Sequence, residues 1–466
     1  MSDDQPTLRF HRGTLVWESP EGLAAPPPGF VWDDRIRAHR TDALRYRALV
    51  EELRAEGRAF HDEARAYFPL TELPHLAPRD PRDYQTAALE AWRENGRQGV
   101  VCLPTGAGKS YLAEMCMVDA ARPTLIIVPT IDLLTQWHRR LVTAFGEPVG
   151  MLGGGSHEIC AITVSTYASA YLHADRLGDR FGLVVFDEVH HLPAESHRTI
   201  AECLIAPFRL GLSATPERED EMHLILDDLV GPEVYRKDIS EMAGEWLASY
   251  EAIRLEVYLT AEEQEAYNEC RAVYHSFLKQ KRMGIRGPRG WTRFIQVASR
   301  SKAGRAALKG WRDARKIAHG TERKLDLLET LLDEEAGRRT LIFTDDNATA
   351  YRISREFLVP CITHQTKAKE REQILERFES GEYQVISTSR VLNEGVDLPA
   401  AEVAVVVSGT GSVREHVQRL GRILRPGHGK RAVLYEMVTM GTSEERTSSR
   451  RREHEAYRLG DAAVEA

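Results

Sequence analysis

From about residue 84 onward, short apolar runs alternate with longer segments in which apolar residues recur at helical spacing. The first series of apolar runs covers residues 99–103, 124–128, 162–165, 183–186 and 208–212. A second series covers residues 340–343, 361–363, 383–387, 403–407 and 432–435. Helices cover both faces of a parallel sheet, so its strands are apolar throughout rather than alternating. The pattern therefore predicts an α/β fold with two similar parallel-sheet lobes.

Two segments depart from this alternation. Residues 1–77 contain a proline-rich break at 25–29 and an amphipathic helical stretch at 45–58, which predicts a small N-terminal domain. Between the two series of strands, residues 271–324 hold 16 Lys or Arg residues and two acidic residues, a formal charge of +14 in a chain of −8. Such a concentration of charge predicts a surface that binds a polyanion. We expect five regions: the N-terminal domain (1–77), a first lobe (78–240), a linker with a basic helical insertion (241–325), a second lobe (326–445) and a C-terminal tail (446–466).

The composition is that of a globular protein with large cores, since 42% of the 466 residues are hydrophobic and 28% are charged. No apolar run approaches the roughly 18 residues that a membrane-spanning helix needs, and the acidic N-terminus has no apolar signal region. We therefore expect a cytoplasmic protein without a membrane partner. The six cysteines include no Cys-x-x-Cys pair, which argues against a zinc site or a disulfide framework.

A glycine-rich segment, Pro-Thr-Gly-Ala-Gly-Lys-Ser, joins the run at 99–103 to a helical stretch. It predicts a phosphate-binding loop, because glycines let backbone N–H groups approach phosphates at the start of a helix. Lys109 would reach the β- and γ-phosphates of ATP, and Ser110 would bind Mg²⁺. Further phosphate contacts are expected from Thr105, Gly106, Ala107 and Gly108. The strict pattern has glycine in place of Leu103, so a turn that binds nothing is the alternative, which the flanking strand and helix disfavour.

An acidic pair, Asp187 and Glu188, follows the apolar run at 183–186. A carboxylate at the end of a parallel strand faces the nucleotide crevice. We expect Asp187 to hold Mg²⁺ and Glu188 to orient or deprotonate the attacking water. Such a pair alone is more often a solvated turn, but its place about 80 residues after the phosphate loop favours catalysis. The adjacent His190 and His191 lack a third ligand at metal spacing, so we expect contacts between residues 187–190 and the neighbouring lobe instead.

Two arginines in the second lobe, Arg422 and Arg425, share one helix face. Two guanidinium groups at this spacing suit the arginine-finger role, in which they reach across a cleft to the γ-phosphate. A solvated basic helix end is the alternative for this stretch taken alone. Together with the phosphate loop, the stretch favours a second half of the ATP site.

In order and spacing, these pieces resemble the motifs of superfamily 2 helicases and translocases over residues 78–440. The resemblance implies two RecA-like lobes and adds motifs at residues 128–130 with 136–137, 165–167, 213–215, 343–345 and 393–397. It implies further nucleotide contacts by Arg82, Gln85, Gly395, Asp397 and Gln418. It also implies that Ser213 and Thr215 couple the ATP site to DNA.

Within the superfamily, the chain looks most like the xeroderma pigmentosum group B helicases, especially the short archaeal and bacterial forms. The stretches that carry this resemblance are residues 187–194, 213–220 and 421–426. The triplet Arg218-Glu219-Asp220 matches the family's Arg-Glu-Asp motif, which is implicated in unwinding. The basic insertion occupies the family's thumb position, and the N-terminal segment resembles its damage-recognition domain.

This resemblance implies a monomeric, ATP-dependent DNA helicase of 3′-to-5′ polarity that works in repair in the prokaryotic cytosol or nucleoid. Its DNA would be single-stranded or at a junction with duplex, and a nuclease is an expected partner. Three alternatives share most of these motifs: a double-stranded DNA translocase that does not separate strands, an RNA helicase, and a nucleotide-dependent clamp. The intact phosphate loop, acidic pair and arginines argue against a clamp that does not hydrolyse ATP.

The basic insertion interleaves aromatic residues with its positive charges. Glycines and a proline at 284–290 predict two helices joined by a mobile tip. Phosphates would be neutralised by the charges, and bases could stack on the aromatics. The aromatic residues fit the core of a helical hairpin equally well. The DNA contacts expected here are Arg286, Arg289, Trp291 and Arg293.

Overall fold

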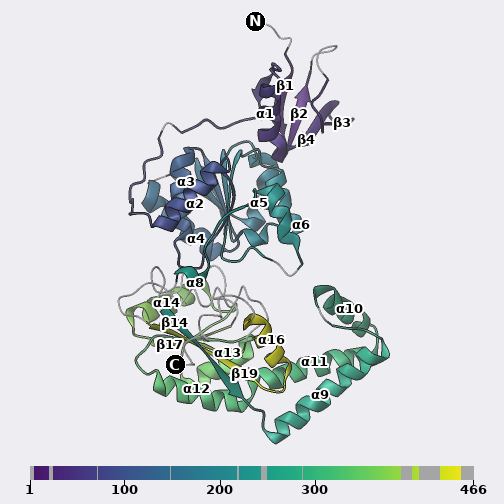
Figure 1. Cartoon of the computed structure of the whole chain (residues 1–466), viewed down its shortest axis with the longest axis vertical. Coiled ribbons are helices and arrows are strands. Elements are labelled where there is room, and N and C mark those ends of the chain that lie inside the picture. The colour runs from purple at the N-terminus through teal and green to yellow at the C-terminus, as the bar shows by residue number, and fades with distance from the viewer. Residues whose placement is uncertain are drawn as a thin grey trace. The chain divides into compact units, whose positions relative to one another are not determined.

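A computed structural model gives the structure of the protein, and the chain forms two compact units (Figure 1). The first comprises Met1–Leu103 and Gly108–Lys237, and the second comprises Pro104–Ala107 and Asp238–Ala466. The residues that the structure describes are 5–19, 25–70, 72–146, 148–217, 220–242, 249–285, 287–389, 401–408 and 431–452. Within these ranges, no helix is long and apolar enough to cross a membrane.

The N-terminal domain is a five-stranded sheet packed on one helix. The strands are β1 (Thr7–His11), β2 (Thr14–Glu18), β3 (Val31–Asp33), β4 (Ala38–Asp42) and β5 (His61–Glu63), in the order β3-β4-β2-β1-β5. Helix α1 (Tyr46–Ala55) covers the core around Trp17, Leu49 and Leu53. The predicted amphipathic helix is confirmed, whereas the sheet was not predicted, because its short strands are largely polar.

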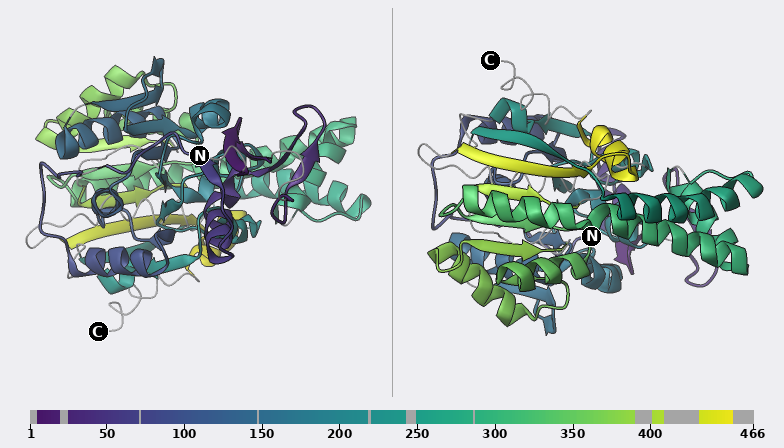
Figure 2. Two further views of the ribbon diagram at one scale, coloured as in Figure 1. Left: turned by 90° about the horizontal axis from the view of Figure 1, so that it is seen from above. Right: turned by 90° about the horizontal axis from the view of Figure 1, so that it is seen from below.

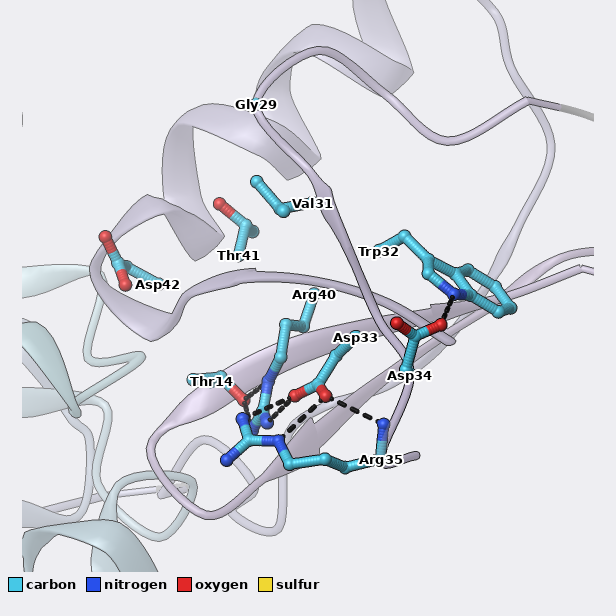
Figure 3. A pocket seen from close by; sticks show the side chains of 10 residues that line it. All are labelled: Thr14, Gly29, Val31, Trp32, Asp33, Asp34, Arg35, Arg40, Thr41 and Asp42. Carbon is cyan, nitrogen blue, oxygen red and sulfur yellow. Dashed lines mark hydrogen bonds and ion pairs between the residues drawn. The ribbon is translucent and has the colours of Figure 1, made fainter. Parts of the chain in front are cut away.

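A cavity of about 790 Å³ opens in this domain (Figure 3). Asp33 accepts hydrogen bonds from Arg35 and Arg40 beside it, and these bonds hold the pKa of the carboxyl well below its usual range. The half-exposed Trp32 donates its indole N–H to Asp34 at 2.7 Å. This network fixes the edge hairpin formed by β3 and β4.

The first lobe contains an eight-stranded sheet in the order β13-β6-β12-β11-β7-β10-β8-β9. All pairs are parallel except β8 with β9. The strands are β6 (Gln98–Cys102), β7 (Thr124–Val128), β8 (Val149–Gly153), β9 (Ser156–His157), β10 (Ile162–Thr166), β11 (Leu183–Asp187), β12 (Phe208–Ser213) and β13 (Glu233–Arg236). The first series of apolar runs thus gives five of these strands to within one residue at each end.

Helices flank this sheet on both sides, with α2 to α4 on one side and α5 and α6 on the other (Figure 1). They are α2 (Asp83–Glu94), α3 (Lys109–Ala120), α4 (Ile131–Phe145), α5 (Tyr167–Leu177), α6 (Glu195–Glu202) and the short α7 (Leu226–Leu229). The glycine-rich loop connects β6 to α3, as the sequence predicts. The site therefore forms at the edge of the sheet where the parallel strands end.

The second lobe is a six-stranded parallel sheet in the order β14-β19-β18-β15-β17-β16. Its strands are β14 (Ser249–Val257), β15 (Thr340–Phe343), β16 (Cys361–Ile362), β17 (Val385–Thr388), β18 (Val403–Val406) and β19 (Arg431–Thr439). The helices are α8 (Ile239–Met242), α12 (Glu322–Glu334), α13 (Asn347–Phe357), α14 (Ala368–Ser380) and α16 (Ser443–Arg452). These two lobes confirm the predicted α/β fold class.

One correction concerns residues 241–325, which the sequence assigned to a linker and the insertion. Strand β14 lies in this range, yet it pairs with β19 along its whole length and forms the edge of the second sheet (Figure 2). Its sequence, Ser-Tyr-Glu-Ala-Ile-Arg-Leu-Glu-Val, alternates polar and apolar residues, unlike the central strands. An edge strand of this kind does not have the continuous apolar run on which the prediction relied.

The insertion itself consists of three helices, not the two that were predicted: α9 (Ala261–Gln280), α10 (Gly287–Ser299) and α11 (Lys302–Gly320). Helices α9 and α11 lie side by side (Figure 2), and a Cβ at Gly310 would lie 2.7 Å from the Cys270 carbonyl oxygen. Helix α10 begins at Gly287, inside the segment expected to form the mobile tip, whereas residues 281–285 are not helical. The helix buries Phe294 completely and packs Trp291 against Trp311 with ring centroids 4.3 Å apart. Packing thus accounts for Phe294, while Trp291 is only partly buried.

Candidate active site

The phosphate-binding loop has the backbone geometry that its glycines predict. Gly106 and Gly108 have φ angles of 85° and 82°, in the left-handed region that favours glycine. A Cβ at Gly108 would lie 2.6 Å from Gln85 Nε2, so a larger residue would displace that side chain. Helix α3 begins immediately afterwards at Lys109, whose amine donates to the Leu103 carbonyl at 3.0 Å.

The loop fits a nucleotide phosphate. The first turn of α3 directs backbone N–H groups toward it, which is favourable for an anion. Thr105 Oγ1 is buried and has no hydrogen-bond partner among the described residues. A hydroxyl in that position can donate to a phosphate oxygen. The donors of the loop therefore match the ATP that the sequence predicts.

Asp187 lies at the end of β11, and its carboxylate is held from two directions. Trp137 on α4 donates its indole N–H to Asp187 Oδ2 at 2.8 Å, and the Glu188 backbone N–H donates to Oδ1 at 3.0 Å. Burial raises the pKa of Asp187, while the Trp137 hydrogen bond and the charge of Lys109 act in the opposite direction. The carboxylate is thus fixed in orientation and lies in the electrostatic field of the loop lysine.

Glu188 adopts a backbone conformation that is uncommon for a residue with a side chain. Its φ of 47° lies in the left-handed region, directly before the turn Val189–His191. Such strain is concentrated at functional sites, where the surrounding structure fixes it. The strained turn aims Glu188 and the buried His190 toward each other, with His190 Nδ1 3.4 Å from Glu188 Oε2.

His190 connects the acidic pair to the next strand. Its Nδ1 lies 3.3 Å from Ser213 Oγ at the end of β12, and the same oxygen accepts the Thr215 backbone N–H at 3.1 Å. His190 is buried within the first lobe, whereas the sequence indicated contacts to the neighbouring lobe. The structure therefore brings Glu188, Ser213 and Thr215 together through one histidine.

Gln85 joins helix α2 to the phosphate loop. Its Oε1 accepts the Arg82 backbone N–H at 3.0 Å, and its Nε2 donates to the Gly108 carbonyl at 3.2 Å. The Arg82 side chain donates to the Tyr84 hydroxyl at 2.8 Å. Both residues to which the resemblance assigns nucleotide contacts therefore lie at the start of α2.

A buried cluster that the sequence did not reveal holds the segment before α2. Glu114 on α3 is 2% exposed; its carboxylate contacts His75 Nε2 at 3.0 Å and accepts a hydrogen bond from Arg140 on α4. The Arg79 backbone N–H donates to the Tyr111 hydroxyl at 2.9 Å. These contacts fix residues 75–79 on the helix that begins at the phosphate loop. His75, Glu114 and Arg140 are far apart in sequence, so no local sequence pattern predicts their contacts.

Several predicted site residues lie outside the described residues. They are Arg218, Glu219, Arg286, Gly395, Asp397, Gln418, Arg422 and Arg425, and the side chain of Arg289 is likewise outside. Glu217, which precedes the Arg-Glu-Asp triplet, pairs with Arg236 on β13. Asp220, the last residue of the triplet, accepts the Met222 backbone N–H at Oδ1 at 3.2 Å. Arg293 is exposed on α10.

Three families match separate parts of the chain. Residues 8–64 match the xeroderma pigmentosum group B helicase damage recognition domain, residues 79–218 the res subunit of type III restriction enzymes, and residues 323–427 the helicase conserved C-terminal domain. The solved Hef helicase domain of Pyrococcus furiosus has a TM-score of 0.51 at 19% identity, over 79% of this chain and 97% of that one. S. cerevisiae Dbp5, solved with RNA and ADP BeF3, has a TM-score of 0.55 at 15% identity, over 81% and 88%. The fold and the phosphate loop define a superfamily 2 helicase with two RecA-like lobes.

Two relatives identify the family within this superfamily. The DNA 3′-5′ translocase XPB2 of Sulfurisphaera tokodaii is 40% identical over 454 residues, which cover 96% of this chain and 99% of the relative. The DNA 3′-5′ helicase XPB of Mycobacterium tuberculosis is 31% identical over 433 residues, covering 87% and 69%. The chain belongs to the xeroderma pigmentosum group B (XPB) family of helicases, as the motifs in its sequence indicate.

Proposed function

We propose that this protein is an ATP-dependent DNA helicase of 3′-to-5′ polarity that acts in DNA repair. The observation that carries the proposal is the phosphate loop with Asp187 and Glu188 at the adjacent strand end, in a chain of the XPB family. Polarity rests on the names of both relatives, and repair rests on the match of residues 8–64 to a damage recognition domain.

In this proposal the loop residues Thr105 to Ser110 bind the phosphates of ATP, and Lys109 supplies a positive charge to them. Ser110 and Asp187 are the residues that would hold Mg²⁺, which neutralises phosphate charge when bound. Gln85 contacts the adenine base, and Arg82 is a further nucleotide contact. Trp137 keeps the Asp187 carboxylate oriented through its 2.8 Å hydrogen bond.

Glu188 orients or deprotonates the attacking water, and His190 connects Glu188 to Ser213 and Thr215. The 3.4 and 3.3 Å contacts of His190 supply that connection. In the same proposal, the ATP site is completed by Arg422 and Arg425. Gly395, Asp397 and Gln418 supply further nucleotide contacts. Arginine side chains that stabilise charge in the transition state raise the rate of phosphoryl transfer by several orders of magnitude.

DNA is gripped by the basic insertion, through Arg286, Arg289, Trp291 and Arg293, and is separated with the help of Arg218, Glu219 and Asp220. The charge of the insertion supports this assignment, because residues 271–324 carry a formal charge of +14 that a polyanion would neutralise. The proposal includes a monomeric enzyme that acts on single-stranded or junction DNA with a nuclease partner.

A double-stranded DNA translocase that does not separate strands is the second candidate, because the Sulfurisphaera relative is named a translocase. Strand displacement on 3′-tailed, 5′-tailed and blunt duplexes, run beside triplex displacement, tests both functions. Unwinding of the 3′-tailed duplex supports the helicase. Triplex displacement without unwinding supports the translocase. Activity on neither substrate, with no DNA-stimulated ATP hydrolysis, refutes both.

A further inference from the structure

The carboxylate of Asp345 in the second lobe contacts two residues of helix α11 in the basic insertion. Arg315 on α11 donates to Asp345 Oδ2 at 2.5 Å, and His319 Nδ1 lies 3.6 Å from the same oxygen. The backbone N–H of Asp345 donates to Ser408 Oγ at 2.9 Å. Asp345 follows β15 and Ser408 follows β18, so this residue joins the insertion to the ends of two neighbouring strands.

Asp345 holds this position with little access to water. Its side chain is 8% exposed, and the side chain of His319 is 9% exposed. Salt screens exposed ion pairs strongly and buried ones much less. The Asp345 end of its contact with Arg315 is therefore weakly screened, while the Arg315 side chain is 33% exposed.

A second set of buried polar contacts holds the same end of the insertion. Thr439 on β19 donates its hydroxyl to the Ala318 carbonyl of α11 at 2.6 Å. Lys324, just beyond α11, is fully buried and donates to the Val407 carbonyl at 2.6 Å and to Glu444 at 2.7 Å. Breaking such pairs leaves a buried charge uncompensated, which is costly. The base of α11 is therefore held at several points, and Asp345 is the one that connects it to the ends of both β15 and β18.

We infer that Asp345 is a positioning residue that couples the basic insertion to the second lobe, so that the insertion moves with that lobe. This inference rests on the proposed function. In parallel α/β sheets the site lies beyond the carboxyl ends of the strands. A shift of the ends of β15 and β18 is passed through Asp345 to Arg315, and from there along α11. ATP-driven movement of the lobe then displaces the DNA that the insertion holds.

The test compares Asp345→Asn with the parent enzyme in base pairs unwound per ATP hydrolysed on a 3′-tailed duplex. We expect this ratio to fall about fivefold or more, the lower bound of typical coupling between sites. Asp326→Asn, at an exposed position on α12 of the same lobe, is the matched control and should keep the parental ratio. Arg315→Ala should lower the ratio as Asp345→Asn does. The ratio in the double variant should be no lower than in either single variant, because each single substitution already removes the contact between Arg315 and Asp345.

Amide hydrogen exchange on the same proteins gives a readout that does not depend on helicase activity. Exchange at the end of α11, around residues 315–320, should accelerate in Asp345→Asn and Arg315→Ala but not in the control. An unchanged ratio, equal loss of ATP hydrolysis and unwinding, additive losses in the double variant, or unchanged exchange overturns the inference. Absence of DNA-stimulated ATP hydrolysis in the parent enzyme would instead refute the proposed function, and the exchange measurement would still decide whether Asp345 fastens the insertion.

Discussion

The hydrogen bond from Trp137 to Asp187 can be removed to test whether it orients the Asp187 carboxylate for Mg²⁺. Replacing Trp137 by Phe keeps an aromatic ring in the core but removes the donor that lies 2.8 Å from Asp187 Oδ2. Both side chains are buried, with 2% and 7% of the residue surface exposed, so water cannot readily replace the lost donor. A hydrogen bond to a charged group contributes about 1.5–3 kcal/mol. We therefore expect the Mg²⁺ concentration for half-maximal ATP hydrolysis to rise by about tenfold or more.

The pH dependence of the same variant follows from the sign of the interaction. The Trp137 hydrogen bond lowers the pKa of Asp187 against the effect of burial, so its loss raises that pKa. Because the ionised carboxylate is the form that binds a cation, the acidic limb of the activity profile should move to higher pH. ATP hydrolysis measured against Mg²⁺ at several pH values separates this effect from a simple loss of folded enzyme.

Trp92→Phe is the matched control. Trp92 is also fully buried in the first lobe, and it donates its indole N–H to the Arg209 carbonyl at 2.9 Å, away from the acidic pair. Its replacement removes the same atoms and the same kind of donor. Equal changes in Mg²⁺ dependence and pH profile in the two variants, or no change in Trp137→Phe, would falsify the reasoning.

Three further predictions concern the rest of the machinery. Lys109→Ala and Glu188→Gln should each lower DNA-stimulated ATP hydrolysis by at least about 100-fold, while Glu188→Gln still binds ATP in an equilibrium binding assay; near-normal turnover in either would contradict the ATP site. Arg422→Ala and Arg425→Ala should lose hydrolysis but keep DNA binding in fluorescence anisotropy, whereas a matching loss of both would make them strand contacts. Alanine at three insertion arginines should weaken DNA binding and flatten its log–log salt slope by about 0.7 to 0.9 per lost phosphate contact, and an unchanged slope would place the DNA grip elsewhere. Those three arginines are Arg286, Arg289 and Arg293.

The central parts of the fold and site could be predicted because their signals are local. Five strands of the first lobe are continuous apolar runs, since helices cover both faces of the sheet. The phosphate loop could be predicted for the same reason, because its glycines, Lys109 and the start of α3 are adjacent in sequence. Asp187 and Glu188 could likewise be assigned from the strand that precedes them.

The contacts that make these residues a working site were decided only by the tertiary structure. Trp137 and Asp187 are 50 positions apart, and His190 and Ser213 are 23 apart, so no local spacing relates them. Strand β14 belongs to the second sheet because β19 lies beside it, although its own alternating pattern suits an edge and resembles a linker. In the insertion, the residues at 284–290 allow either a mobile tip or a helix, and packing of Phe294 into the core selects helix α10. Sequence alone determines which segments form strands and which residues can bind phosphate, because backbone preference and hydrophobic pattern act over a few residues. Which donor forms a hydrogen bond with which carboxylate depends on how segments distant in sequence pack together, and this packing forms only with the whole core.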